Sequence, residues 1–485
     1  MSSTENLAMH SPGDWNDESN GVTYVFLVAF VAAVGGFLFG YDLNVVAGAA
    51  TYLRDHFDLT SEQFGLAMSS AILGALTGPL ISGAICDRVG RRRALLGAAI
   101  LFGVSAIGTA LPRSIFEFNV YRFIGGVGVG IASVVSPMYI AEISPPRLRG
   151  RLVMMNQLAI VVGALIAICA AWIISTALPE QVSWRWMFGS EIVPIVLFAI
   201  FLIMVPESPR WLLERGRGTE ALEVLTRING RSSAREQYGE IVATLATEPG
   251  KFGDLFHPGM RKALVLGIVL SVLSQWTGWS MISFYLTTIF EKAGVSQKSD
   301  AILWAIAPNV ANIGFSVLGL LLVDRVGRRP LYLVGAILMV VSTAFLGWCF
   351  QQDVQGPLVL VAVTLCALPH AVALGSVPWL IVSEIFPNGV RSWAMSLCAL
   401  TLWIAAFIST HAAPQLFFFF EERFGTPAGL FFLSSGFSIA AFVFAWWNLP
   451  ETRGRSLEDI ANAWTQSPPA RGNAVSLVRT AESEP

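Results

Sequence analysis

The chain has 485 residues, of which 54% are hydrophobic and 13% are charged, against about 25% charged residues in soluble domains. This composition excludes an ordinary soluble protein and indicates one that crosses a membrane several times. The formal net charge of -2 provides no basic surface, so we expect the lipid bilayer, and no nucleic acid, as a partner.

The first apolar run extends from Tyr24 to Ala50 and is long enough to cross a bilayer, since a span needs about 20 apolar residues. Asp42 lies inside this run. A carboxylate at that depth costs about 2.5 to 3.5 kcal/mol on insertion scales, so it should face a partner or a water-filled cavity. An ionisable residue inside a membrane therefore predicts a functional site, here one that handles protons.

Further apolar runs of spanning length follow at about 63–86, 94–111, 116–141, 152–176, 187–205, 262–290, 300–323, 331–350, 357–383, 392–420 and 428–448. The predicted fold class is an all-α membrane protein with twelve transmembrane helices. In this arrangement 24 of the 31 lysines and arginines fall on one side and six on the other. The positive-inside rule then predicts a multi-pass cell-membrane protein with both termini in the cytoplasm.

Three segments occur twice, in the same order. DRVGRRR at 87–93 returns at 324–330, PMYIAEISPPRLRG at 137–150 returns loosely at 378–392, and PESPR at 206–210 returns as PETRG at 450–454. Their nearly equal offsets predict two homologous six-helix bundles in parallel orientation. The expected domains are a cytoplasmic tail (1–23), a first bundle (24–205), a cytoplasmic helical linker (206–261), a second bundle (262–448) and a cytoplasmic tail (449–485).

Arg122 is the one basic residue that falls inside a span, and it is the expected partner of Asp42. Counted from the outer ends of their helices, Asp42 lies about 12 Å deep and Arg122 about 9 Å deep, so the two side chains can meet. A carboxylate beside a guanidinium that opens and closes can bind and release a proton. The alternative is a static ion pair that fixes the packing of two helices.

The duplicated DRVGRR loops predict a gate on the cytoplasmic side. Asp87 and Asp324 are placed to interact with the positive end of a helix, and the loop arginines are expected to pair with Glu142 and Glu384. The alternative is that these residues only satisfy the positive-inside rule. The expected gate residues are Asp87, Arg88, Gly90, Arg91, Glu142, Arg149, Glu207, Arg210, Asp324, Arg325, Gly327, Arg328, Glu384, Arg391, Glu451 and Arg453.

Nine segments together resemble the sugar porter family of the major facilitator superfamily: GGFLFGYD, DRVGRR twice, YRFIGGVGVG, PMYIAEISPPRLRG, WRWMFGSE, PESPRW, IFEKAGV and LPETRG. The resemblance implies two pseudo-symmetric bundles that rock about a central sugar site by alternating access. It implies a transporter and not an enzyme, without a cofactor, acting as a monomer with a proton as the coupling ion. The residues that match the proton-coupled members are Asp42, Arg122 and Glu191.

The sugar site of the family is matched only in part. The matching residues are Gln157, Gln275, Asn312, Trp379 and Trp403, whereas Ser274 and Ser280 stand where the family has an amide. Ala371 and Ala406 also stand where polar side chains are common, and Trp276 and Trp279 are larger than usual. A hexose or pentose is the expected substrate. The alternative within transport is a polyol or inositol-like solute, carried by symport or passively with Asp42 as a structural remnant.

Two other interpretations remain at this point. A sensor that keeps the fold without turnover is disfavoured by the short segment after Leu449, and a membrane enzyme by the lack of a nucleophile with its base, a metal cluster or a phosphate loop in the sequence. His370 and His411 lie within spans, where each either senses pH or only packs.

Overall fold

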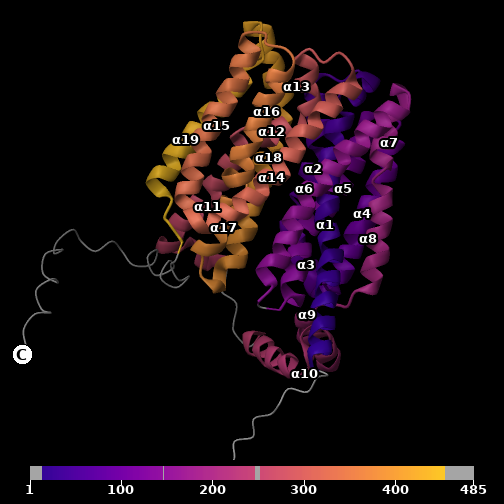
Figure 1. Ribbon diagram of the computed structural model, residues 1–485, viewed down its shortest axis with the longest axis vertical. Helices are drawn as coiled ribbons and strands as arrows, with labels where there is room; N and C mark the ends of the chain where they lie inside the picture. Colours follow the sequence, from indigo (N-terminus) through magenta and orange to yellow (C-terminus); the bar gives the residue numbers. More distant parts are fainter. Residues whose placement is uncertain (1–13, 146, 246–251, 454–485) are drawn as a thin grey trace, which may run out of the picture.

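The computed structural model describes residues 14–145, 147–245 and 252–453. The described chain is helical, and eleven stretches are long and apolar enough to span a membrane. A twelfth span is discontinuous and consists of three short helices, so the predicted all-α fold with twelve spans is confirmed. Figure 1 shows the two halves as neighbouring bundles, the first in indigo to magenta and the second in orange to yellow.

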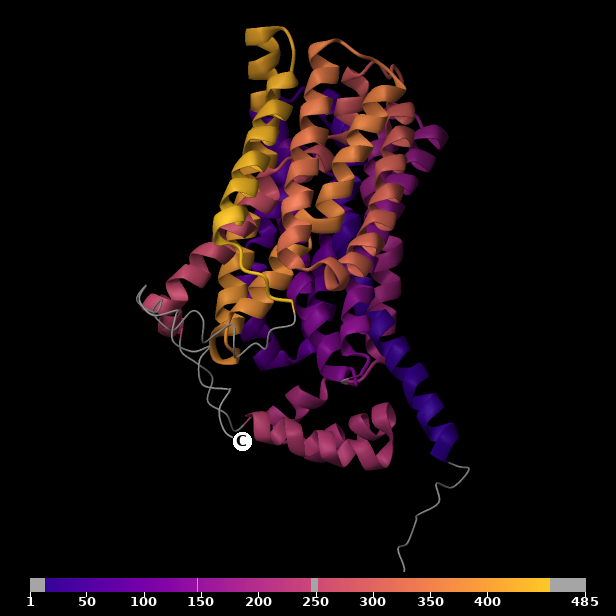
Figure 2. The ribbon, with the colours of Figure 1, turned by 60° about the vertical axis from the view of Figure 1, so that its left-hand side comes forward.

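The first bundle contains six spans, of which the second and the sixth are interrupted. The span helices are α1 (Asp14–Phe57), α2 (Ser61–Ala75) with α3 (Gly78–Val89), α4 (Arg91–Ala110), α5 (Ile115–Ile143), α6 (Arg149–Ala177), and α7 (Glu180–Gly189) with α8 (Ile192–Met204). Helix α1 therefore begins inside the segment that we expected to be a tail, and its first turns extend beyond the bundle in Figure 2.

The linker also forms helices, as expected: α9 (Pro209–Glu214), α10 (Gly218–Leu245), which is kinked at Gly230, and the 3₁₀ turn η1 (Phe252–Phe256). Helices α9 and α10 lie beneath the first bundle, at the end where the duplicated arginine loops lie (Figure 2). We call this the basic end of the molecule and the other the opposite end.

The second bundle repeats the pattern with a different set of breaks. Its helices are α11 (Pro258–Trp276), α12 (Trp279–Phe284) and α13 (Leu286–Lys292), α14 (Lys298–Val326), α15 (Arg328–Gln351), α16 (Pro357–Pro369) continued by the π turn η2 (His370–Leu374) and α17 (Val377–Ile385), α18 (Asn388–Phe424) and α19 (Ala428–Asn448). Gly278, with φ of 116°, separates α11 from α12, because few residues other than glycine adopt this backbone conformation. The periodicity of the apolar runs does not reveal these breaks.

Glycine contacts set the position of α1 against its neighbour α6. A Cβ atom on Gly40 would lie 1.9 Å from the main-chain oxygen of Ile160, and one on Gly163 would lie 2.1 Å from that of Phe37. The two backbones therefore touch without intervening side chains, as is common for packed helices in lipid. This close packing holds the middle of α1, and with it Asp42, in the interior of the first bundle.

Candidate functional site

The buried ion pair that the sequence predicted is present in the middle of the first bundle. The Nη1 atom of Arg122 on α5 lies 2.8 Å from Oδ1 of Asp42 on α1, and both residues are 0% exposed. The guanidinium also lies 5.6 Å from the ring centroid of Phe188 on α7. A charge pair removed from water in this way is strongly destabilised if one partner is lost.

A second carboxyl group adjoins this pair. Glu191 follows α7, is 1% exposed and lies beside Asp42, and Oδ2 of Asp42 and Oε1 of Glu191 are both buried without a hydrogen-bond partner. Two adjacent buried carboxylates repel each other, so one proton on the pair is favoured. The three side chains come from three spans, and the sequence motif FGSE marked Glu191 in advance.

The charge balance of this triad follows from that proton. With one proton shared by Asp42 and Glu191, the two acids and Arg122 are neutral together, and without it they carry one net negative charge. A dry interior disfavours an unbalanced charge by several kcal/mol. The arrangement can therefore hold one proton while it is closed to water and can release it when water reaches the site.

Three of the expected sugar-site residues form one hydrogen-bonded group at the break between α11 and α12. The Ser280 hydroxyl donates to Oε1 of Gln275 at 2.5 Å, and Nε2 of Gln275 donates to the Ser274 hydroxyl at 3.2 Å. Ser274 and Ser280, which stand in place of amides, thus orient Gln275, the one amide of the segment 274–280. Gln275 keeps one N–H and further acceptor capacity for a ligand.

The other predicted polar residues lie apart from this group. Gln157 on α6 is exposed and Asn312 on α14 is partly exposed, and these two helices pack against each other across the two halves. Trp379 on α17 is 38% exposed. Among the described residues the structure records no bond from these three to Gln275. The helices that carry the expected sugar-site residues are therefore present, but the described contacts do not connect Gln157, Asn312 or Trp379 to Gln275.

An aromatic contact that the sequence did not indicate links the halves at mid-depth. Phe39 on α1 lies 5.8 Å from Trp403 on α18, between ring centroids, only three residues before Asp42. Trp403 and Ala406 pack into the hydrophobic cluster of the first bundle. Ala406, where the sequence comparison expected a cavity amide, is 5% exposed and serves this packing. Phe39 belongs to the GGFLFGYD segment, in which the sequence analysis assigned a role only to Asp42.

The large tryptophans of the seventh span serve helix packing. The Trp276 indole N–H donates to the main-chain oxygen of Ala405 on α18, and its ring meets Phe437 edge-on at 5.1 Å. Trp279 is 5% exposed and lies 6.2 Å from the His370 ring, between centroids. The polar atom of Trp276 is therefore already bound within the protein.

At the basic end, the first duplicated loop is joined to the end of the first bundle. Arg91 pairs with Glu142 at 2.9 Å, and the Ser208 hydroxyl donates to the same carboxylate at 2.5 Å. Oε1 of Glu207 accepts the main-chain N–H groups of Arg91 and Arg92 at 2.9 and 3.1 Å. Glu207 therefore occupies the positive N-terminus of α4.

The second half repeats these contacts with the corresponding residues, with Thr452 in place of Ser208. Arg328 pairs with Glu384 at 2.9 Å, the Thr452 hydroxyl donates to Glu384 at 2.5 Å, and Glu451 accepts the N–H groups of Arg328 and Arg329 at 3.2 and 3.1 Å. Burial alone would raise the pKa of Glu451, but the main-chain N–H groups around it hold that pKa below its usual value. The expected pairing of loop arginines with Glu142 and Glu384 is present.

The two aspartates of the expected gate differ from the prediction. The helix N-termini are occupied by Glu207 and Glu451, and not by Asp87 and Asp324, because the chain after each sixth span folds back beneath the loop. Asp324 instead pairs with Arg328 at 3.0 Å. The arginines seven residues after the gate glutamates bind main-chain oxygens, those of Ala141 for Arg149 and Phe386 for Arg391.

The remaining gate residues lie around these two centres. Gly90 and Gly327 have φ of 93° and 100°, as the tight turns require, and Arg210 pairs with Glu214. Arg453 donates to the main-chain oxygen of Arg325, and Arg88 lies in the last turn of α3, three residues before Arg91. Each described ion pair at the basic end lies within one half or joins it to the linker, so none of them ties the two halves together.

The halves are tied together at the opposite end. Nζ of Lys298 on α14 lies 2.6 Å from Asp55 of α1 and 3.2 Å from Glu180 of α7, and the Thr287 hydroxyl of α13 donates to the main-chain oxygen of Ala47 at 2.7 Å. We call Lys298, Asp55 and Glu180 the outer latch. Lys298 is one of the six basic residues that the sequence places on this side, and the sequence predicted no partner for it. The structure is thus closed at the opposite end.

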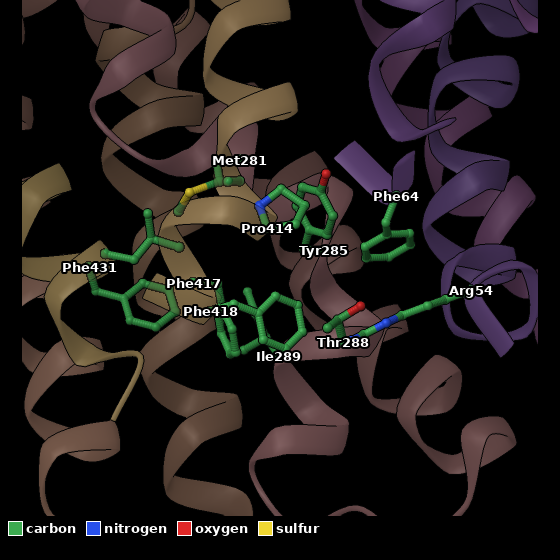
Figure 3. A pocket seen from close by; sticks show the side chains of 12 residues that line it. Arg54, Phe64, Met281, Tyr285, Thr288, Ile289, Pro414, Phe417, Phe418 and Phe431 are labelled. Carbon is green, nitrogen blue, oxygen red and sulfur yellow. The ribbon is translucent and has the colours of Figure 1, made fainter. Parts of the chain in front are cut away.

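A small pocket lies in the same seam (Figure 3). Arg54 and Phe64 enter it from the first half, and the guanidinium of Arg54 lies 4.6 Å from the centroid of the Phe418 ring of the second half. The walls are largely aromatic and aliphatic, and the Tyr285 hydroxyl is bound to the main-chain oxygen of Thr410. A sugar needs several polar partners, so this pocket does not suit one.

The outer latch predicts a shift in the conformational equilibrium when Lys298 is removed. Lys298→Met loses both ion pairs between the halves, and because their carboxylates are more than half exposed, each pair is worth less than about 1 kcal/mol. A membrane-impermeant maleimide should therefore label a Thr288→Cys reporter in the seam roughly two to five times faster in this variant. Lys292→Met is the control, because Lys292 pairs with Glu421 within one half. Equal rates in the two variants would contradict the latch.

Two six-helix halves, a buried charge triad and closure at one end define a secondary transporter of the major facilitator fold. Comparison with known proteins places the chain more closely. The family model "Sugar (and other) transporter" matches residues 28–464, nearly the whole chain. The protein belongs to this family, as the sequence motifs predicted, and it is therefore a transporter and not an enzyme.

Characterised relatives cover almost the full chain. The arabinose-proton symporter of Bacillus subtilis is 36% identical over 456 residues, which are 92% of this chain and 96% of that one. The D-xylose-proton symporter of Escherichia coli is 33% identical over 478 residues, 91% of this chain and 96% of that one.

Solved structures of the xylose transporter XylE from E. coli share the fold. A partially occluded inward-open conformation matches with a TM-score of 0.80 and 32% identity over 90% of this chain and all of that one. A complex of XylE with 6-bromo-6-deoxy-D-glucose matches with a TM-score of 0.75 and 32% identity over 91% of this chain and 99% of that one.

Proposed function

We propose that the protein carries a pentose or hexose across the cell membrane together with a proton. The observation that carries this proposal is the triad of Asp42, Arg122 and Glu191, a fully buried site whose charge balances when it holds one proton. The names of the relatives support the sugar and the proton. The basic end is then the cytoplasmic side, with both termini there, and one chain suffices for transport.

Transport follows from the contacts at the two ends of the molecule. When the outer latch is broken, a proton and a sugar enter from outside, and the neutral triad and the filled sugar site allow the halves to close there. The latch then forms, and the basic end opens because its ion pairs lie within each half and do not hold the halves together. Water that reaches the triad from the cytoplasm lets the proton leave.

The direct test is uptake into proteoliposomes with an acidic exterior. A panel of pentoses, hexoses and polyols would be offered, and we expect one or more of the sugars to accumulate above the external concentration until a protonophore is added. Equilibration without accumulation for every solute would contradict symport. Accumulation of polyols only would contradict a sugar substrate and leave the coupling intact.

The sugar site predicts a loss of affinity when either glutamine is truncated. Gln157→Ala and Gln275→Ala should each weaken binding of the transported sugar roughly 3- to 10-fold, the effect of losing one hydrogen bond. Binding can be measured by the sugar-dependent change in tryptophan fluorescence of the purified protein. Gln352→Ala, an exposed amide at the end of α15, is the control. Unchanged affinity in both test variants would mean that the sugar binds elsewhere.

A further inference from the structure

A hydrogen bond lies immediately beside the two carboxyl groups of the triad. The Tyr41 hydroxyl and the Ser190 hydroxyl are 2.6 Å apart, and Ser190 donates its own proton to the main-chain oxygen of Met187, also at 2.6 Å. Tyr41 must therefore be the donor to Ser190. Tyr41 is 3% exposed, so water does not compete for this bond.

The two hydroxyl residues directly precede the two acids in the sequence. Tyr41 is followed by Asp42 on α1, and Ser190 is followed by Glu191 in the break between α7 and α8. At this junction the Ser190 N–H donates to the main-chain oxygen of Trp186, whereas the Glu191 N–H reaches only that of Phe188, so the regular helical hydrogen bonding is interrupted at Glu191. The bond from Tyr41 joins α1 to this break one residue away from the carboxyl pair.

We propose that Tyr41 and Ser190 are positioning residues that hold the carboxyl groups of Asp42 and Glu191 together so that they share a proton. This inference rests on the proposed proton coupling and adds two residues to it that touch neither the proton nor the sugar. Tyr41 acts through α1 on Asp42, and Ser190 acts through the chain break on Glu191.

The direction of the effect follows from the groups around the acids. Arg122 on α5 and Glu191 are the charged groups that the structure records facing Asp42, and a Cβ on Gly125 of α5 would lie 2.4 Å from the Ser105 hydroxyl of α4 and 3.4 Å from Oδ1 of Asp42. If the two acids move apart, a proton on either one loses its carboxyl partner. The two acids then take up a proton only at a lower pH.

The test is the pH dependence of gradient-driven sugar uptake in Tyr41→Phe and Ser190→Ala. In both variants we expect the pH of half-maximal uptake to fall by about 0.5 to 1 unit, the range that corresponds to one hydrogen bond. Sugar exchange without a gradient should proceed at the wild-type rate, which shows that the variants are folded. Ser190→Thr keeps the hydroxyl and should restore the wild-type curve.

Two controls match the chemistry of the substitutions. Tyr332→Phe removes the hydroxyl of another fully buried tyrosine, in the second half, and Ser183→Ala removes a hydroxyl on α7 that is bound to main-chain oxygens of Leu178 and Pro179. Neither should shift the curve. An unchanged curve in Tyr41→Phe, or an equal shift in Tyr332→Phe, would overturn the proposal.

A second comparison separates this inference from the proposed function. In Asp42→Asn, which lacks the shared proton, adding Tyr41→Phe should have no further effect on pH dependence. If wild-type uptake already ignores the pH gradient, the proposed coupling is wrong. If Asp42→Asn removes coupling while Tyr41→Phe leaves the pH curve unchanged, the coupling stands and the positioning role is wrong.

Discussion

Asp42→Asn is expected to abolish sugar accumulation driven by a pH gradient while leaving sugar exchange between the two sides intact. Asparagine has nearly the same shape as aspartate and still offers an oxygen to the Arg122 guanidinium, 2.8 Å away in the native protein. It cannot take up a proton, and Arg122 and Glu191 can balance each other's charge permanently. The halves can then close with or without an external acid load.

The size of the effect is set by the gradient. With one proton carried per sugar, a gradient of one pH unit supports up to about tenfold accumulation, and the variant should only equilibrate. Uptake and counterflow of radiolabelled sugar in proteoliposomes measure the two properties separately. Asp300→Asn, an exposed acid in the first turn of α14, is the control. If Asp42→Asn accumulates sugar as wild type does, the triad is a static ion pair and the proton is carried elsewhere.

Gly65→Leu is expected to stop transport by keeping the opposite end open. Gly65 on α2 faces α18 of the other half, where a Cβ would lie 2.3 Å from the main-chain oxygen of His411 and 3.2 Å from its carbonyl carbon. The backbone cannot give way as a flexible side chain would, so closure becomes costly by several kcal/mol, which corresponds to a turnover reduced by at least about 100-fold.

The same variant should still bind sugar from the open side, and this outcome separates a blocked movement from misfolding. Counterflow measures turnover and tryptophan fluorescence measures binding. Gly97→Leu is the matched control, because a Cβ on Gly97 of α4 meets nothing within 4 Å. Normal counterflow by Gly65→Leu would show that α2 and α18 do not need this contact during transport.

Several features of the site could be read from the residues alone. An acid and an arginine at matching depths in apolar spans can lower the cost of burial by meeting each other, and Asp42 and Arg122 do meet. The duplicated loops predicted paired gates, and Arg91 with Glu142 and Arg328 with Glu384 form them. Both predictions concern charged residues, whose burial is so costly without a partner of opposite charge that few other arrangements are stable.

Other features depend on how distant segments pack. No periodicity could show that Glu207 and Glu451 reach the helix N-termini ahead of Asp87 and Asp324, since this depends on the path of the chain after each sixth span. The contact of Phe39 with Trp403 and the bonds of Lys298 join residues of the two halves that are more than 100 positions apart in sequence. The partners of Phe39 and Lys298 therefore depend on how the two halves pack against each other.

The sequence by itself determined the membrane class, the twelve spans, the two repeated halves and the charged residues that must find partners, because apolar length and buried charge carry large free energies that local surroundings cannot offset. Only the tertiary structure decided which end is closed, which side chains hold it closed and how Tyr41 and Ser190 tie the two acids together. Each of these contacts is worth about 1 kcal/mol. Contacts this weak form only where helix packing brings their partners together, and they produce no recognisable pattern in the sequence.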